Sequence, residues 1–206
     1  MRKATRIVAA SFGIVAGFGG LEHGYFEILQ GNVRPESIMI ASMGAPCVPE
    51  EIWNACEPAM TIIPNFLFTG ILAMLLGLVA MVWAAAFVQR KQGGTILALL
   101  SFGLLLFGGG IFPPVIGMIG GGLGSRINTL LEKEPGPVWR TLAIVWPWAI
   151  VVFCVWLLGQ FAIGYFFNEF LMQNAVLIPV LPLGLLVLSV LAGYGHDLRK
   201  HGRAEV

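Results

Sequence analysis

The alternation of long hydrophobic runs with short polar segments is the most informative feature of the chain. Several apolar runs exceed the roughly 18 residues that mark a membrane-spanning helix. Glycine, proline and charged residues separate these runs. The pattern predicts an all-α, polytopic integral membrane protein. It would be a helical bundle with a single transmembrane domain, residues 1–206, and six spans at about 5–29, 61–88, 95–111, 113–131, 141–165 and 175–194.

Composition supports a membrane protein and argues against a soluble or nucleic-acid-binding one. Of the 206 residues, 57% are hydrophobic and 11% are charged, whereas an ordinary soluble domain carries roughly 25% charged residues. The formal net charge of +1 provides no basic field for nucleic acid. We therefore expect the lipid bilayer as the main partner and no nucleic-acid partner.

The third and fourth predicted spans could instead form one broken helix, which would leave five crossings. Basic residues decide between the two counts, because Lys and Arg near span ends favour the cytoplasm. They mark the N-terminus, the segment after the second span and the C-terminus as cytoplasmic: Arg2, Lys3 and Arg6, then Arg90 and Lys91, then Arg199, Lys200 and Arg203. Two cytoplasmic termini require an even count. Six spans are therefore predicted in a prokaryotic plasma membrane, with the loop 31–60 outside.

Glycine is unusually frequent, with 27 residues, and it concentrates in the first and fourth predicted helices. At 100° per residue, glycines of the first helix share one narrow stripe, which consists of Gly13, Gly17, Gly20, Gly24 and Gly31. Such a stripe can pack closely on another helix, including one of a homo- or hetero-oligomeric partner. The fourth helix, with Gly120, Gly121 and Gly122 in succession, allows the same packing or a local break around a ligand. Both interpretations of the fourth helix remain open.

The loop 31–60 contains Cys47 and Cys56. An extracytoplasmic position permits a disulfide between them, which would close a small lid over the outer face; two free thiols are the alternative. No histidine accompanies these cysteines, so they lack the pattern of a zinc site.

The stretch GGLEHGYFEILQG, residues 19–31, places charged side chains at the end of the first apolar run. His23 and Glu27 are four positions apart and can interact, whereas Glu22 points to another face. His23 would lie roughly 10 Å from the bilayer midplane, where a charge must face protein or water. Glu27 falls near the outer interface, so it is either an interfacial helix end or a binding residue. The candidate ion- or ligand-binding residues are Glu22, His23, Glu27, Asn65 and Glu169, with Glu57 at the same outer depth.

The first predicted helix contains two side chains that could bind a metal. His23 and Glu27 could supply two ligands to one metal, but a stable site needs more. A bis-histidine haem would need a second histidine within the membrane, and His196 and His201 belong to the basic C-terminal tail. The identity of any metal or cofactor is therefore not predicted.

Three functions fit these features. A transporter or channel-like protein for an ion or small solute is favoured by the polar groups of the first helix, the glycine-rich fourth helix and a short echo between GYFEIL (24–29) and GYFFNEFL (164–171). A non-catalytic membrane subunit or scaffold is the alternative. An intramembrane metal-dependent enzyme acting on lipid, with Glu22, His23 and Glu169, is the weakest, because neither Gly-x-Ser-x-Gly nor His-Glu-x-x-His occurs in the sequence.

Overall fold

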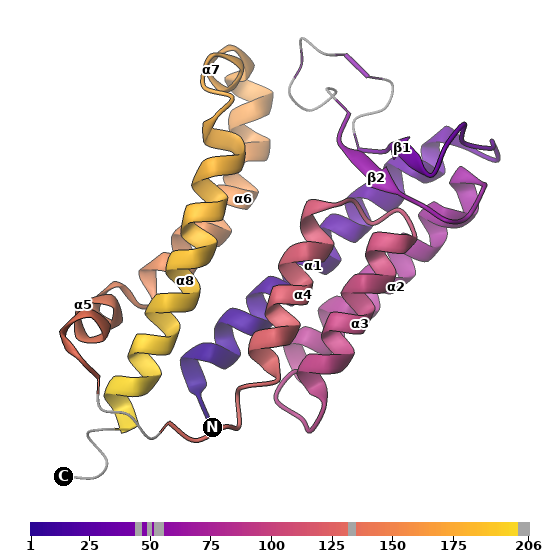
Figure 1. The fold of residues 1–206 in the computed structure, drawn as a ribbon. Helices are drawn as coiled ribbons and strands as arrows, with labels where there is room; N and C mark the ends of the chain where they lie inside the picture. Colours follow the sequence, from indigo (N-terminus) through magenta and orange to yellow (C-terminus); the bar gives the residue numbers. More distant parts are fainter. Residues whose placement is uncertain (44–46, 49–50, 52–55, 132–134, 202–206) are drawn as a thin grey trace. The chain divides into compact units, whose positions relative to one another are not determined.

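A computed structural model of the chain describes residues 1–206 except 44–46, 49–50, 52–55, 132–134 and 202–206. The described residues form eight helices and one two-stranded sheet (Figure 1). In chain order these elements are α1 (Lys3–Gln30), β1 (Met39–Ala41), β2 (Pro58–Met60), α2 (Phe66–Ala86), α3 (Gly93–Leu106), α4 (Phe112–Gly124), α5 (Pro137–Val145), α6 (Trp148–Phe166), α7 (Asn168–Gln173) and α8 (Leu177–His201). Arg203 and part of the predicted loop 31–60 lie outside the described residues.

Within the described part of the chain, four helices are long and apolar enough to cross a membrane. They are Lys3–Gln30, Phe66–Ala86, Trp148–Phe166 and Leu177–Lys200. The third and fourth predicted spans correspond to α3 and α4, which have 14 and 13 residues. These two helices are shorter than the roughly 20 residues that cross a bilayer. The structure is thus compatible with a membrane protein that has four full-length spans and two shorter apolar helices.

The chain divides into two compact units. One, here the four-helix unit, is Ala9–Ser125 and holds most of α1 together with the sheet, α2, α3 and α4. The other, here the C-terminal unit, combines Met1–Val8 with Arg126–Val206 and holds the start of α1 and helices α5 to α8.

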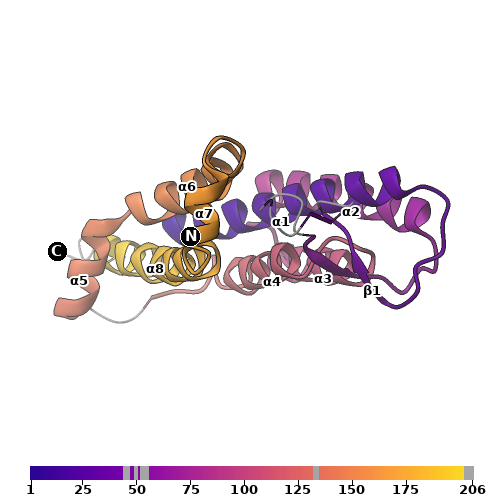
Figure 2. The same ribbon diagram turned by 90° about the horizontal axis from the view of Figure 1, so that it is seen from above.

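Within the four-helix unit, α1 and α2 form one layer and α3 and α4 a second (Figure 2). Glycine pairs bring the backbones of α1 and α2 together. A Cβ on Gly24 would lie 2.6 Å from the carbonyl oxygen of Gly70, and a Cβ on Gly70 would lie 2.6 Å from that of Gly24. Gly17 and Gly77 make the same mutual contact two helical turns away. The glycine stripe of α1 is therefore a packing face inside this unit.

The helix α4 is continuous through Gly120, Gly121 and Gly122. A Cβ on Gly121 would lie 2.6 Å from both the Gly94 carbonyl oxygen and the Ala98 amide nitrogen of α3. Close packing on a neighbour, rather than a break around a ligand, is thus the state that forms. Because glycine has no side chain, the two helix backbones can touch while each helix keeps its own backbone hydrogen bonds. The fourth span was expected to extend to residue 131, but the helix ends at Gly124.

A short β-hairpin covers one end of the four helices, although the sequence predicted only helices. β1 and β2 are antiparallel, with Met39 opposite Met60 and Ala41 opposite Pro58. The strand β2 also pairs with the turn between α3 and α4, because the Gly108 amide donates to the Met60 carbonyl at 2.9 Å. Residues 61–65 are used in this pairing and in the turn that follows, so α2 begins at Phe66 instead of residue 61.

In the C-terminal unit, the predicted span 141–165 is divided between α5 and α6. Trp146 ends α5 with an extended backbone, φ −73° and ψ 135°. The physical reason is Pro147, because the residue before a proline is pushed out of the helical region. Helix α8 packs against both α5 and α6.

The N-terminus is held by a buried carboxylate of α8. Asp197 is 2% exposed, and it accepts hydrogen bonds from the Ala4 amide at 3.0 Å and the Thr5 amide at 2.8 Å. The Thr5 hydroxyl donates to the same carboxylate at 2.8 Å. These amides belong to the first turn of α1, where N–H groups lack helical partners and an anion is favoured. The start of α1 and the end of α8 therefore lie together.

Candidate functional site

The polar interior of the four-helix unit gathers at the Gln30 end of α1, beneath the β-hairpin. His23 is 1% exposed and Glu27 is 0% exposed. Ser42, next to β1, is also fully buried, and Glu57 precedes β2. We call these four residues, His23, Glu27, Ser42 and Glu57, the His23–Glu27 cluster.

Glu27 is enclosed by protein. The Ser42 hydroxyl donates to Glu27 Oε1 at 2.9 Å, and the same hydroxyl lies 3.3 Å from the His23 carbonyl oxygen. Glu27 Oε2 is buried and has no hydrogen-bond partner among the described residues. Glu27 lies in the last turn of α1, and its depth in the membrane stays a prediction. Its cover is a distant segment that folds over the end of α1, which the periodicity of one helix cannot reveal.

His23 connects the buried part of the cluster to its surface. Its Nε2 atom lies 3.6 Å from Oε2 of Glu57, whose side chain is 54% exposed. Its other ring nitrogen, Nδ1, is buried without a hydrogen-bond partner in the described structure. Each of the two buried side chains thus carries one free polar atom. Burying such an atom unpaired costs about 1–3 kcal/mol.

The turn between α3 and α4 forms the floor of the cluster. A Cβ on Gly108 would overlap the carboxyl group of Glu27, and a Cβ on Gly110 would overlap the imidazole of His23. Both glycines also have positive φ, +86° and +81°, which other residues adopt only with strain. Glycine is required here for both space and backbone conformation.

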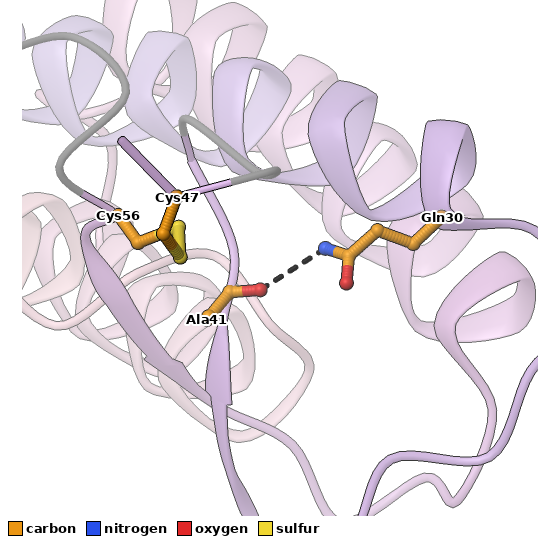
Figure 3. The surroundings of a disulfide bond; sticks show 4 residues. All are labelled: Gln30, Ala41, Cys47 and Cys56. Atoms are coloured by element: carbon orange, nitrogen blue, oxygen red, sulfur yellow. Dashed lines mark hydrogen bonds between the residues drawn. A yellow bond between two sulfur atoms is a disulfide. The ribbon is translucent and has the colours of Figure 1, made fainter. Parts of the chain in front are cut away.

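The hairpin positions Ser42 and Glu57 through its backbone. The Ser42 amide donates to the Glu57 carbonyl at 3.0 Å, and the Glu57 amide donates to the Met43 carbonyl at 2.9 Å. Directly beyond this pairing, Cys47 and Cys56 form a disulfide with a Cα–Cα distance of 5.1 Å (Figure 3). Of the two states that the sequence left open, the structure contains the bridged one.

The end of α1 is tied to the same hairpin. The Gln30 side-chain amide donates to the Ala41 carbonyl at 3.0 Å (Figure 3). The hairpin is therefore fixed to α1 at the last residue of β1, and the disulfide joins its two arms beyond that point. Both connections keep Ser42 and Glu57 over the end of α1.

The structure brings only some of the predicted site residues to the cluster. Glu22 is half-buried and interacts with Glu57 as a like charge, so Glu57 faces both Glu22 and His23. Asn65 instead caps α2, accepting from the Phe68 amide at 3.1 Å. Glu169 lies in α7 of the C-terminal unit, where Gln173 donates to it at 3.3 Å.

Sequence reasoning missed Ser42, Gly108 and Gly110 as site residues. The sequence signal that could have found the glycines is the run of three, Gly108 to Gly110, just before a proline pair. Such a run marks a tight turn that needs positive φ. Ser42 carries no comparable local signal.

The site has no recognisable metal-binding set. In the described ranges, no group of three or more His, Cys, Asp and Glu side chains is placed to hold a metal ion. The interior between the cluster and the other end of α1 is tightly packed and mostly apolar, with Ser101 as a buried polar residue. Its buried residues include Phe12, Ala16, Ala73, Leu97 and Leu104.

Comparison with known protein families, curated proteins and solved structures finds no match for this chain. The function must therefore be argued from the geometry of the cluster itself.

Proposed function

We propose that the chain is a small membrane transport protein that binds an ion or small solute at the His23–Glu27 cluster. The observation that supports this is the complete burial of His23 and Glu27, each with one unpaired polar atom. Ionisable residues within membrane segments are costly and are typical of ion pathways and proton relays. A residue that only fills the core is usually apolar, as Val8, Ala9, Phe12 and Ala16 of α1 are.

The proposed topology has six crossings, with both termini in the cytoplasm and the cluster on the outer side of a prokaryotic plasma membrane. Support comes from the basic residues at the termini and from Asp197, which joins the end of α8 to the start of α1. In the four-helix unit, Gly120 of α4 packs on Ala9 and Phe12 of α1, so α4 returns to the level at which that unit begins. An oxidising outer compartment also suits the disulfide.

The packed interior favours a carrier over an open channel. Below the cluster, glycine contacts bring α1 against α2 and α4, and apolar side chains fill the remaining space. An ion that binds at the cluster can pass further only if helices move. Alternating exposure of the site to the two sides is therefore the proposed mode of transport.

Flux through proteoliposomes tests this function. Purified protein is reconstituted, and uptake of protons, rubidium and sodium is followed with a pH-sensitive dye inside the vesicles and with radioactive tracers. We expect flux of one of these ions that Glu27→Gln and His23→Ala abolish. Glu36→Gln, an exposed carboxyl of the same unit, is the control and retains flux. Equal flux in wild type, Glu27→Gln and His23→Ala contradicts the proposal.

A non-catalytic subunit of a larger complex is the second candidate, and the close packing of the interior below the cluster is the observation that favours it. The glycines of α1 and α4 that were expected to bind a partner are largely covered within the four-helix unit. Gly122 is an exception, because a Cβ on this residue would meet no atom within 4 Å. Purification in a mild detergent separates the candidates, because a subunit retains a stoichiometric partner and a carrier does not require one.

A further inference from the structure

The His23–Glu27 cluster and its immediate surroundings contain more acidic groups than basic ones. Helix α1 contributes Glu22 and Glu27, and the segment before β2 contributes Glu57. Helices α2, α3 and α4, which pack against α1, contain no acidic or basic residue. Arg34 is exposed in the following loop. A fully ionised cluster would thus place net negative charge in apolar surroundings, which is costly unless the charge is paired.

Two helix ends oppose ionisation of the buried carboxyl of Glu27. Glu27 belongs to the last turn of α1, and Gly108, on which its carboxyl lies, directly follows Phe107, the C-cap of α3. Both ends are negative poles, which disfavour a carboxylate. The neutral acid is therefore the favoured form of Glu27.

The hydrogen bonds of Ser42 indicate the same form of Glu27. The hydroxyl has one hydrogen, yet it lies within hydrogen-bond distance of Glu27 Oε1 and of the His23 carbonyl oxygen, at 2.9 and 3.3 Å. Both oxygens are acceptors when Glu27 is ionised, so the single hydroxyl hydrogen can serve only one of the two contacts. When Glu27 carries a proton on Oε1, it donates to Ser42, and Ser42 donates to the His23 carbonyl. The protonated form therefore places a hydrogen in both contacts, whereas the ionised form places one in a single contact.

We propose that the ion bound at the His23–Glu27 cluster is a proton, held on the buried carboxyl of Glu27 and received from the surface through Glu57 and His23. This inference rests on the proposed transport function, and it names the substrate of the same site. The absence of a metal-ligand set among the described residues is in keeping with it, because a proton needs one oxygen whereas a metal needs several ligands.

The geometry assigns each step to named atoms. Glu57 takes a proton from solvent, and its O–H bond breaks as an N–H bond forms at Nε2 of His23, 3.6 Å away. The imidazolium then releases the hydrogen on Nδ1 to Oε2 of the Glu27 carboxylate, and a half-turn of the resulting acid about its Cγ–Cδ bond places the protonated oxygen beside Ser42. Nδ1 of His23 and Oε2 of Glu27 are the two buried atoms of the cluster without a partner in the described structure. They belong to adjacent turns of α1, where side chains four positions apart can approach each other.

Infrared spectroscopy of the purified protein at neutral pH tests the protonated carboxyl directly. We expect a C=O stretching band of a carboxylic acid in wild type that is absent in Glu27→Gln and retained in the control Glu36→Gln. Ser42→Ala keeps the band but shifts it to higher frequency, because Glu27 loses its hydrogen-bond partner. Glutamine has the shape of the protonated acid, so Glu27→Gln is expected to fold, and gel filtration checks this.

A wild-type spectrum without the band, or a band that persists in Glu27→Gln, overturns the inference. Vesicle measurements separate it from the transport proposal. If the band depends on Glu27 but no ion crosses the membrane, the proton site is supported and the transport function is contradicted. If Glu27 is ionised while sodium or rubidium crosses, the transport function is supported and the proton is contradicted as its substrate. Proton flux that is lost together with the band in Glu27→Gln supports both.

Discussion

At the scale of single residues, Gly108 is the position where backbone and site depend most closely on each other. Its φ is +86°, and a Cβ there would overlap the carboxyl of Glu27. We expect Gly108→Ala to lower the free energy of unfolding by about 1–3 kcal/mol, through strain at this φ and displacement of Glu27. Thermal unfolding in detergent measures this. Gly122→Ala in α4, where a Cβ meets nothing within 4 Å, is the control and should be neutral or stabilising. Equal effects of the two substitutions would contradict the assignment.

Asp197 is the second residue from which a specific result follows. Asp197→Ala removes the acceptor of the Ala4 amide and of the Thr5 amide and hydroxyl. We expect a loss of stability of about 1–3 kcal/mol, because buried donors are left unpaired. Asp197→Asn keeps one oxygen and should lose less, and Thr5→Val removes only the hydroxyl bond. An unfolding temperature of Asp197→Ala equal to that of wild type would show that this carboxylate does not hold the N-terminus.

The sequence reveals the candidate residues better than their surroundings. The spacing of His23 and Glu27 on one helix follows from periodicity. Their burial depends on Ser42, Glu57 and Gly108, which are brought there by tertiary pairing that no local pattern encodes. Asp197 stands within a basic tail in the sequence, and its role as a cap for α1 is likewise a long-range contact.

At the scale of elements, the helices were easier to predict than their ends. The heptad spacing of Gly17 and Gly24 in α1 matches that of Gly70 and Gly77 in α2. Two antiparallel helices with equal spacing can therefore meet at both pairs at once. The ends of α2 and α5 differ from expectation because of strand pairing and Pro147. The echo between segments 24–29 and 164–171 stays a prediction.

The β-hairpin is the element whose removal should affect the site without disturbing the helices. Its disulfide closes a short loop, and losing it typically costs about 2–4 kcal/mol of stability. We expect the Cys47→Ser/Cys56→Ser double variant to keep its helical circular dichroism but to lose ion flux and the Glu27 carboxylic-acid band, because Glu57 and Ser42 are no longer held over α1. Cys154→Ser, which leaves the bridge intact, is the control. Unchanged flux and an unchanged band would show that the hairpin is not needed.

At the scale of the whole molecule, hydropathy indicates a membrane protein, and four of its helices have the required length and composition. The division into two compact units and the shortness of α3 and α4 could not be foreseen. Hydropathy measures the apolar character of a run, whereas the length of α3 and α4 is limited by the glycine turn beneath the hairpin. Charge then remains the main guide to orientation.

Labelling of single cysteines determines that orientation. In a Cys154→Ser background, where Cys47 and Cys56 remain bridged, one exposed residue at a time is replaced by cysteine and treated with a membrane-impermeant maleimide on intact cells. We expect Glu36→Cys to react from outside, because it lies in the loop that follows α1. Lys91→Cys, Thr129→Cys and Lys200→Cys should react only after the membrane is opened, since the first two follow helices that return to the cytoplasmic side and Lys200 lies in the last turn of α8. All four positions are exposed in the structure. Thr129 tests whether α3 and α4 each cross the membrane. Labelling of Thr129→Cys from outside would show that the chain is not on the cytoplasmic side after α4, which would contradict the six-crossing topology.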